Sequence, residues 1–462
     1  MNEEEKQKQA EKYFFQGIVY SAEGEYDKAI EAYNKSIKLK PNVNAYFDLG
    51  IAYNVKGEYD KAIEAYNKAI KLNPNFATEY NNLGDVYKNK GEYDKAIEAY
   101  NKAFELKPDD DYFNYKIDMN DDNRNVYKEI YQYSYIIMRL LHINNNKEMA
   151  YGFAHYTRKS IAENLLIKKK KNDKGEGEVS PFRLSTILTS NDPTEGLVAF
   201  KYLGLENKET KMDYQAFIAC FTFDAECLNQ FRLYGKEQGQ EATGVSLVFK
   251  KDFFSEQLTA NMIPEYAKSA SDGQSASRKK KPSQEEKYPL YRCVYIDPET
   301  RQIIALGHKD DYVFFRDEPE TDSKKIQEKI NDYKEKINKN LQAVREEFDN
   351  LKSLIETNKD KINLQLVCDL LIHMRYLAKH IAFKEEQECR IVKVEALSNH
   401  EKVKLEDNKM FINTCSIVDF VDRIYFAPSA VDMEFFQEKL VYDGLKHITC
   451  YQCKHPIRTH KA

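Results

Sequence analysis

One pattern of apolar and polar positions occurs three times in the N-terminal third of the chain. The segment GEYDKAIEAYNK stands at residues 24–35, 57–68 and 91–102. Small residues let two helices approach closely, aromatic side chains fill the space between them, and a proline ends each helix pair. The pattern therefore predicts an α-solenoid of three helix pairs over residues 1–110. The recurring residues are Gly17, Gly50 and Gly84, then Tyr33, Tyr66 and Tyr100, then Pro41, Pro74 and Pro108.

The next segment has a helical pattern of its own. Asp and Asn residues that suit a helix start stand at 121–123, and apolar side chains then recur at Val126, Ile130, Ile137 and Leu141. A terminal repeat needs a cover for its apolar face. The sequence therefore predicts a capping or bridging helix within residues 111–144.

From about residue 145 the pattern changes to short apolar runs separated by turns, which are typical of strands. Helical stretches lie between these runs, so the sequence predicts an α+β domain over residues 145–462 with a mixed, mostly antiparallel sheet. The strands are expected at residues 150–156, 217–223, 244–250, 291–297, 302–306, 312–316, 388–394, 423–427 and 448–453.

Residues 323–357 carry apolar side chains at a mean spacing of about 3.6, which indicates a long amphipathic helix. A second helix is expected at 361–380. Together they predict a helical hairpin, at about 323–380, inserted into the α+β domain. The hairpin could pack within the domain or form a dimerising coiled coil, so the oligomeric state stays open.

Charge and cysteine content exclude several classes of protein. The net charge is −5, which disfavours a nucleic-acid partner, and no apolar run is long enough to span a membrane. The start, MNEEEKQKQA, is unlike a secretion signal. The eight scattered cysteines suit a reducing compartment, so we expect a cytoplasmic location, or delivery to a target cell as an effector. The pair Cys450-x-x-Cys453 supplies only two of the four ligands that a structural zinc site needs, so no metal is expected.

The threefold pattern is very similar to the tetratricopeptide repeat. That resemblance implies a concave face that binds a protein or peptide partner, although the stack could also pack on a neighbouring domain of the same chain. In one mode of these repeats, a Lys and an Asn on the first helix grip a C-terminal carboxylate. Phe14 and Ile18 stand at those positions here, so this mode is not expected.

Three further blocks mark the second part of the chain. They are NDPTEG at 191–196, LNQFRLYG at 228–235 and EQECR at 386–390. Together they resemble a bacterial family called domain of unknown function 2971, often found beside tetratricopeptide repeats, over roughly residues 150–460. The family name implies no activity, so function has to be inferred from the residues.

The last block contains two carboxylates and a guanidinium at alternate positions. On a strand, Glu386, Glu388 and Arg390 would project from one face. Such a cluster is costly in an apolar environment unless it is solvated, paired or used in chemistry. It is therefore either a solvent-facing stripe with a salt bridge or a catalytic pair.

A strand-ending His-Tyr-Thr, followed much later by Glu-x-Glu, resembles the ADP-ribosyltransferases. The resemblance implies that NAD is the substrate, that Glu388 stabilises the oxocarbenium-like transition state and that Glu386 orients the acceptor. The middle Ser-Thr-Ser motif of that superfamily is not evident, and Thr222 is only a loose substitute. The implied NAD-binding residues are His155, Tyr156 and Thr157 as the anchor, Tyr234 against nicotinamide, and Arg183 and Arg232 at the pyrophosphate.

Three functions follow as hypotheses. The first is an NAD-dependent ADP-ribosyltransferase or NAD glycohydrolase whose repeats recruit a protein. The second is a non-catalytic scaffold or sensor, in which His155 is a hydrogen-bonded core residue. The third is a metal-dependent nuclease, which would use Asp192, Glu195, Glu386 and Glu388 as Mg²⁺ ligands.

Overall fold

The structure is a computed structural model in which the chain divides into two compact units. Unit 1 comprises Met1–Asp110, Lys128–Leu140 and Asn338–Asn350, and unit 2 comprises Asp111–Tyr127, Leu141–Ile337 and Leu351–Ala462. The residues that the structure describes are 2–106, 111–144, 146–150, 152–168, 178–186, 196–205, 214–234, 242–255, 287–317, 321–407 and 409–453.

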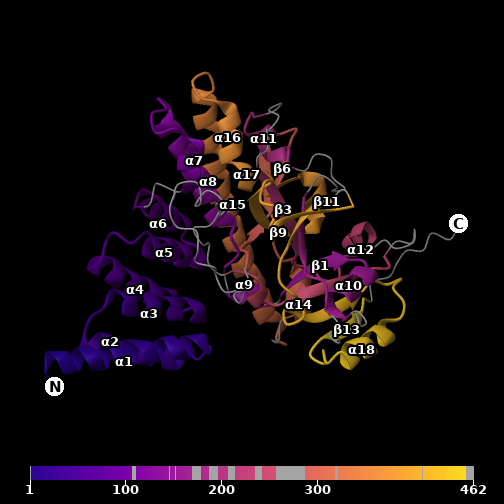
Figure 1. The fold of residues 1–462 in the computed structure, drawn as a ribbon, viewed down its shortest axis with the longest axis horizontal. Helices are drawn as coiled ribbons and strands as arrows, with labels where there is room; N and C mark the ends of the chain where they lie inside the picture. Colours follow the sequence, from indigo (N-terminus) through magenta and orange to yellow (C-terminus); the bar gives the residue numbers. More distant parts are fainter. Residues whose placement is uncertain are drawn as a thin grey trace. The chain divides into compact units, whose positions relative to one another are not determined.

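Unit 1 contains three consecutive helix pairs, one for each copy of the repeated pattern (Figure 1). Each second helix begins at the tyrosine of the GEYDKA motif, and Gly57 and Gly91 end α3 and α5 in the left-handed conformation that glycine adopts without strain. The helices are α1 (Glu3–Ala22), α2 (Tyr26–Leu39), α3 (Val43–Lys56), α4 (Tyr59–Leu72), α5 (Ala77–Lys90) and α6 (Tyr93–Leu106).

The recurring glycines and tyrosines form the contact within each pair. A Cβ atom added to Gly50 would lie 2.7 Å from the ring of Tyr66, and one added to Gly84 would lie 2.5 Å from the ring of Tyr100. Both rings are fully buried. The glycine therefore leaves the space that the tyrosine ring of the partner helix fills.

Replacing Gly50 with alanine should destabilise the second helix pair by about 1–3 kcal/mol, because the buried ring of Tyr66 has to move. Hydrogen–deuterium exchange in α3 and α4 measures this change locally, and both helices should exchange faster. Asn44→Ala, at an exposed position of the same α3, is the matched control and should leave exchange unchanged. Equal protection in the two variants would contradict this role for the glycine.

The third repeat is covered within unit 1 by residues of α8 (Arg124–Leu141). The Arg139 guanidinium lies 3.4 Å from Asp85, and Lys88 donates a 2.9 Å hydrogen bond to the Arg139 carbonyl oxygen. The Tyr100 hydroxyl donates to the same Asp85 carboxylate at 2.8 Å. These buried charges are paired, as burial requires.

Unit 2 contains two sheets and shorter helices. Its ten-stranded sheet, counted over the described residues, holds β1 (Phe153–Thr157), β2 (Arg183–Ser185), β3 (Tyr214–Thr222), β4 (Val245–Phe249), β5 (Leu290–Arg292), β9 (Glu388–Ala396), β10 (Val403–Glu406), β11 (Lys409–Asn413), β12 (Val421–Phe426) and β13 (Thr449–Gln452). A smaller sheet joins β6 (Val294–Asp297), β7 (Gln302–Leu306) and β8 (Ala378–His380).

The helices of unit 2 are short apart from its share of α15 (Ser323–Asn358). They are α7 (Asp111–Lys116), α9 (Asn146–Met149), α10 (Lys159–Leu166), α11 (Val198–Tyr202), α12 (Leu228–Tyr234), α14 (Asp311–Asp317), α16 (Leu364–Leu370), α17 (Ile372–Arg375) and α18 (Met433–Tyr442), with 3₁₀ helices at Lys251–Phe253 (η2) and Ile381–Glu386 (η3).

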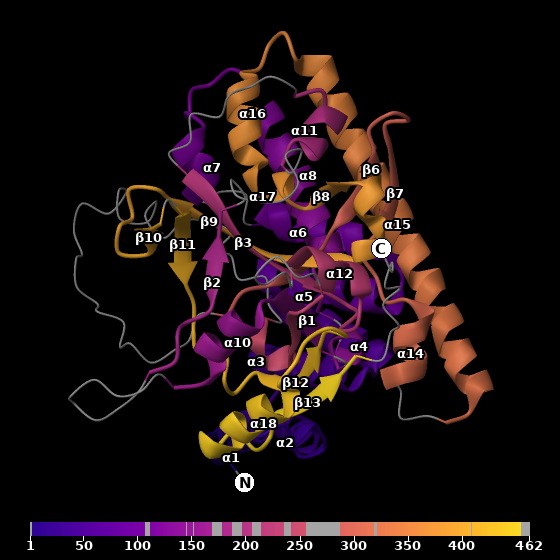
Figure 2. The same cartoon turned by 90° about the vertical axis from the view of Figure 1, so that its right-hand side faces the viewer.

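Three strands of the large sheet pair with β3, namely β9, β2 and β1 (Figure 2). β9 pairs antiparallel with β3 along the whole of one edge, from Tyr214 to Thr222. A strand has only two edges, so β1 and β2 share the other edge. β2 pairs with β3 at Ile218 and β1 pairs with it at Thr222. The two strands thus leave a split beside the middle of β3.

Aromatic side chains fill the core of unit 2 around this split. The rings of Phe182, Phe221 and Phe249 lie 5.3–6.1 Å apart, and Phe249 lies 4.7 Å from Phe253. All four side chains are buried. Aromatic rings in such edge-on and tilted contacts make large apolar contributions to stability.

The predicted α+β class with an N-terminal solenoid is confirmed, and several local predictions are wrong. The strand expected at 291–297 is divided between β5 and β6, which belong to different sheets. Residues 312–316, expected as a strand, lie in α14, because Asp311 suits a helix start and the adjacent Val313 and Phe314 are both buried. The helix expected at 361–380 breaks into α16 and α17. It is followed by β8, because residues 378–380 pair with β6.

Candidate functional site

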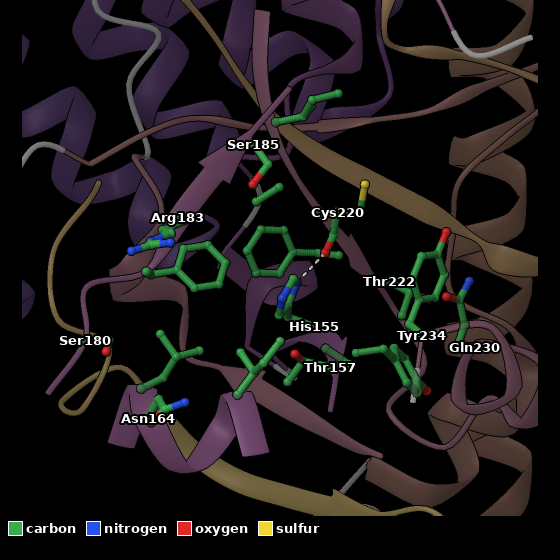
Figure 3. Close-up of a pocket in the computed structure, with 18 of the residues that line it drawn as sticks. His155, Thr157, Asn164, Ser180, Arg183, Ser185, Cys220, Thr222, Gln230 and Tyr234 are labelled. Atoms are coloured by element: carbon green, nitrogen blue, oxygen red, sulfur yellow. Dashed lines mark hydrogen bonds between the residues drawn. The ribbon is translucent and has the colours of Figure 1, made fainter. Parts of the chain in front are cut away.

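A pocket of about 610 Å³ lies at the split beside β3 (Figure 3). His155 and Thr157 come from β1, Arg183 and Ser185 from β2, and Tyr234 from α12. Glu388, the first residue of β9, also lines it. β1 and β2 diverge along the same edge of β3, and side chains from these distant segments line the space between the two strands.

His155 lies at the centre of the pocket wall in Figure 3. Its Nδ1 lies 2.8 Å from the carbonyl oxygen of Cys220, and since a carbonyl only accepts, Nδ1 carries the proton. Burial lowers the pKa of His155, although the bond to Cys220 opposes this effect. The ring is therefore neutral at pH 7, and its Nε2 is a hydrogen-bond acceptor.

Tyr156 and Thr157 line the same pocket but differ in how they are held. The Tyr156 hydroxyl donates to the carbonyl oxygen of Asp224 at 2.8 Å and accepts from the backbone N–H of Cys227 at 2.7 Å. These bonds fix the turn between β3 and α12. Thr157 is buried, at the end of β1.

Glu388 is buried among cationic side chains. One carboxylate oxygen accepts from Nε of Arg390 and the other from Nζ of Lys379. Lys379 also donates to Glu386, so its ammonium bridges the two carboxylates. The Arg390 guanidinium donates in addition to the carbonyl oxygen of Tyr376 at 2.6 Å, which fixes its position.

The predicted strand geometry is wrong at Glu386. Glu386 ends the 3₁₀ helix η3, and Gln387 has φ +45° before β9 begins at Glu388. Glu386 does not line the pocket, in contrast to Glu388. The two carboxylates approach because Lys379 binds both, and not because of strand alternation.

The pKa values of the two carboxylates move in opposite directions. Burial alone would raise the pKa of Glu388, but the charges of Arg390 and Lys379 outweigh burial and hold it well below the usual range. Burial and the Glu388 charge raise the pKa of Glu386. Such divergence between neighbouring acids is typical of sites that handle charge or protons.

The two predicted arginines are placed differently. Arg183 lines the pocket, its guanidinium lies 3.9 Å from the centroid of the Phe411 ring, and its Nη1 lies 2.7 Å from Glu406. Arg232 lies on α12 and is absent from the pocket lining. Tyr234, two residues later, lines the pocket. Its pKa is raised, first by partial burial and then by the charges of Glu388 and Glu386.

Comparisons with known families agree with this division of the chain. Residues 17–57 and 52–91 match the family described as TPR repeat, and residues 77–110 match Tetratricopeptide repeat. Residues 230–391 match the family described as Protein of unknown function (DUF2971).

The chain carries tetratricopeptide repeats followed by a DUF2971 domain.

Both of these resemblances are thus confirmed, the second over residues 230–391 of the 150–460 that were predicted, and the repeats make the first unit a protein-interaction module. The matched DUF2971 residues supply Tyr234, Lys379 and Glu388, whereas His155 and Arg183 precede the matched segment. The matched families do not include the ADP-ribosyltransferases, so that resemblance stays a prediction. No curated protein matches the chain.

Several solved structures resemble part of the chain. Two crystal structures of MamA are 38% and 34% identical, with TM-scores of 0.21 and 0.23, and cover 21% and 28% of this chain. The chain spans 54% and 66% of the length of those two proteins. The TPR2B domain of yeast Sti1, in a complex with pHsp70, is 27% identical; the match covers 21% of this chain and 79% of that one, with a TM-score of 0.21.

Two further findings concern the described residues alone. None of their helices combines the length and the apolar character needed to cross a membrane. Among the same residues, no group of three or more His, Cys, Asp or Glu side chains is arranged to hold a metal ion. Asp192 and Glu195, which the nuclease hypothesis requires, lie outside the described residues. The cytoplasmic location stays a prediction.

Two cations of the site, Lys379 and Lys409, are not among the residues predicted from the sequence. The hairpin prediction places Lys379 on a helix, yet Lys379 stands in the largely apolar run YLAKHIAF, and a lysine in such a run needs a carboxylate partner. Lys409, which lines the pocket, is the first residue of β11. The apolar run Met410-Phe411-Ile412, after the turn-favouring residue types Asp407 and Asn408, is the signal that indicates this strand.

Proposed function

We propose that the pocket beside β3 binds NAD and cleaves the bond between nicotinamide and ribose, and that the repeats hold a protein partner or target. The observation that carries this proposal is the shared pocket. Six of the eight residues that the sequence assigned to NAD chemistry line it: His155, Tyr156, Thr157, Arg183, Tyr234 and Glu388.

The charge at Glu388 suits cleavage of a glycosidic bond. As the bond breaks, positive charge develops on the ribose, and a fixed carboxylate stabilises it. Arg390 and Lys379 hold Glu388 ionised at neutral pH. Each cation takes one lone pair of a different carboxylate oxygen. Cys220 and Glu386 also hydrogen-bond the Glu388 carboxylate, so a ribose hydroxyl has to take the place of one of these two groups.

The proposed reaction needs no reactants other than NAD and either water or a nucleophile of the protein target. The C1′–N bond breaks, and its electron pair leaves with nicotinamide, which becomes neutral. Water or a nucleophile of the protein target then bonds to C1′ and loses one proton to solvent. The products are nicotinamide with either ADP-ribose or an ADP-ribosylated acceptor.

The other pocket residues supply binding and orientation. Nε2 of the neutral His155 can accept a hydrogen bond from a ribose hydroxyl. The ring of Tyr234 offers a flat surface for nicotinamide, as aromatic side chains do for planar ligands. Figure 3 shows Arg183 and Tyr234 on opposite sides of His155, which suits a ligand with an aromatic end and a phosphate-bearing part.

The proposal is tested by incubating the purified full chain with NAD and following nicotinamide release by chromatography. Tyr234→Ala should lower kcat/KM about tenfold, since an aromatic contact contributes about 0.5–1.5 kcal/mol beyond its buried area. Arg232→Ala, on the same helix but outside the pocket lining, is the matched control and should retain full activity. Equal activity of both variants would contradict the assignment of the pocket.

A nucleotide sensor without turnover is the second candidate. It is favoured by the fact that both carboxylate oxygens of Glu388 already accept hydrogen bonds from buried cations, as in a purely structural cluster. A sensor should show a rise in melting temperature with NAD that Tyr234→Ala reduces, and no nicotinamide release even with excess protein.

A further inference from the structure

The mouth of the pocket carries charged side chains from three neighbouring strands. β11 pairs with both β2 and β10, and Phe411 lies opposite Ser185 while Lys409 lies opposite Glu406. Residues directly opposite each other, and residues two apart on one strand, share a face of the sheet. Arg183, Phe411, Lys409 and Glu406 therefore lie on one face, and Arg183 and Lys409 both line the pocket.

The Arg183 guanidinium is held on this face by two contacts. It lies over the Phe411 ring, and its Nη1 bonds the Glu406 carboxylate at 2.7 Å. The side chains of Arg183 and Glu406 are 45% and 56% exposed. An ion pair in that setting contributes only about 0–1 kcal/mol, so a ligand anion of higher charge can replace the carboxylate. Phe411 would keep the guanidinium in place during the exchange.

This cationic mouth is distant from the Glu388 carboxylate. Glu388 lies on β9, which pairs with one edge of β3, whereas Arg183 lies on β2 at the other edge and Lys409 on β11 beyond β2. Adjacent strands are about 4.8 Å apart, so two to three strand spacings, roughly 10–14 Å, separate these cations from Glu388. The pocket thus has an anionic group at one end and two cations toward the other. A dinucleotide has the matching order, with a cationic nicotinamide followed by a diphosphate.

We propose that Arg183 and Lys409 form a subsite for the diphosphate of a dinucleotide, and that Glu406 occupies the Arg183 fork until the diphosphate displaces it. Arginine suits this role because its planar fork binds two phosphate oxygens, while lysine adds a second charge. Glu406, on β10, then competes with the diphosphate for the Arg183 guanidinium. The inference rests on the proposed function of the pocket, but its test requires no turnover.

The test is calorimetric binding of ADP-ribose to the full chain. Glu406→Gln should tighten binding several-fold, because Arg183 no longer has to give up a carboxylate. Lys409→Ala should weaken binding about tenfold, the loss expected for one charge-assisted hydrogen bond of about 1.5 kcal/mol. Lys446→Ala is the matched control. Lys446 is an exposed lysine between α18 and β13 and is not part of the pocket lining.

The outcomes separate the subsite from the catalytic proposal. Tighter binding by Glu406→Gln with weaker binding by Lys409→Ala supports the subsite, even if the protein releases no nicotinamide. Unchanged or weaker binding by Glu406→Gln overturns it, even if NAD is cleaved, as does an absence of ADP-ribose binding. Nicotinamide riboside, which lacks phosphate, should bind all of these variants equally. Discrimination among them by this probe would also overturn the subsite.

Discussion

Replacing Glu388 with glutamine is expected to reduce nicotinamide release at least about 100-fold, because removing one preorganised electrostatic group from an active site commonly costs 10²–10³ in rate. The neutral amide cannot offset the positive charge that develops on the ribose. The measurement is kcat with saturating NAD. Glu395→Gln is the matched control, since Glu395 lies on the same strand, is buried and is absent from the pocket lining.

The structure also predicts a cost in stability for this variant. Arg390 and Lys379 would each lose a carboxylate partner in a buried environment, so the melting temperature should fall. Glu388→Asp keeps the charge and shortens the side chain, so it should fold well and still lose activity at least about tenfold. Full activity in folded Glu388→Asp and Glu388→Gln proteins would show that Glu388 is structural.

Replacing Lys379 with methionine should destabilise unit 2 by about 3–5 kcal/mol at pH 8, the range for removing one partner of a buried ion pair. The Lys379 ammonium is the cation that both Glu386 and Glu388 share. The expected loss is read from chemical unfolding followed by tyrosine fluorescence. Lys379→Met/Glu386→Gln should recover part of this loss, because one of the two carboxylates no longer needs a partner.

The loss of stability in Lys379→Met should also depend on pH, and it should be larger at high pH than at low pH. Burial alone would lower the pKa of Lys379, but Glu388 and Glu386 outweigh burial and raise it, so in the native protein its contribution persists throughout the neutral range. In the variant, the pKa of Glu386 rises further above its ordinary value of about 4.3. The folded state then binds more protons than the unfolded state, so stability falls as pH rises above that value. A loss that is equal at pH 5 and pH 8 would contradict the shared-cation arrangement.

The sequence predicted the repeats well because each helix pair depends on local contacts. Gly50 and Tyr66 stand in one repeat and meet through helix packing alone. The strand 302–306 was also predicted with its observed limits, and it is bounded by clear turn signals. Short-range patterns of this kind need no knowledge of the rest of the chain.

The site was harder to predict because its contacts join distant segments. Glu386 was placed on a strand, since the positive φ of Gln387 leaves no mark in an apolar–polar pattern. Lys379 was assigned to a helix, since only pairing with β6 makes residues 378–380 a strand. Arg183 and Lys409 line one pocket through the pairing of β2 with β11, two strands that are far apart along the chain.

The split beside β3 also determines how the protein can be divided for experiments. The segment matched by the DUF2971 family, residues 230–391, excludes β1, β2, β3 and β11. A fragment cut at those limits would keep Glu388 and Tyr234, but it would end β9 after Ile391 and lose β3, which pairs with β9 along its whole length, together with the pocket residues of β1, β2 and β11. Chemistry in this domain therefore has to be sought with the flanking strands included, because the family boundary crosses the site.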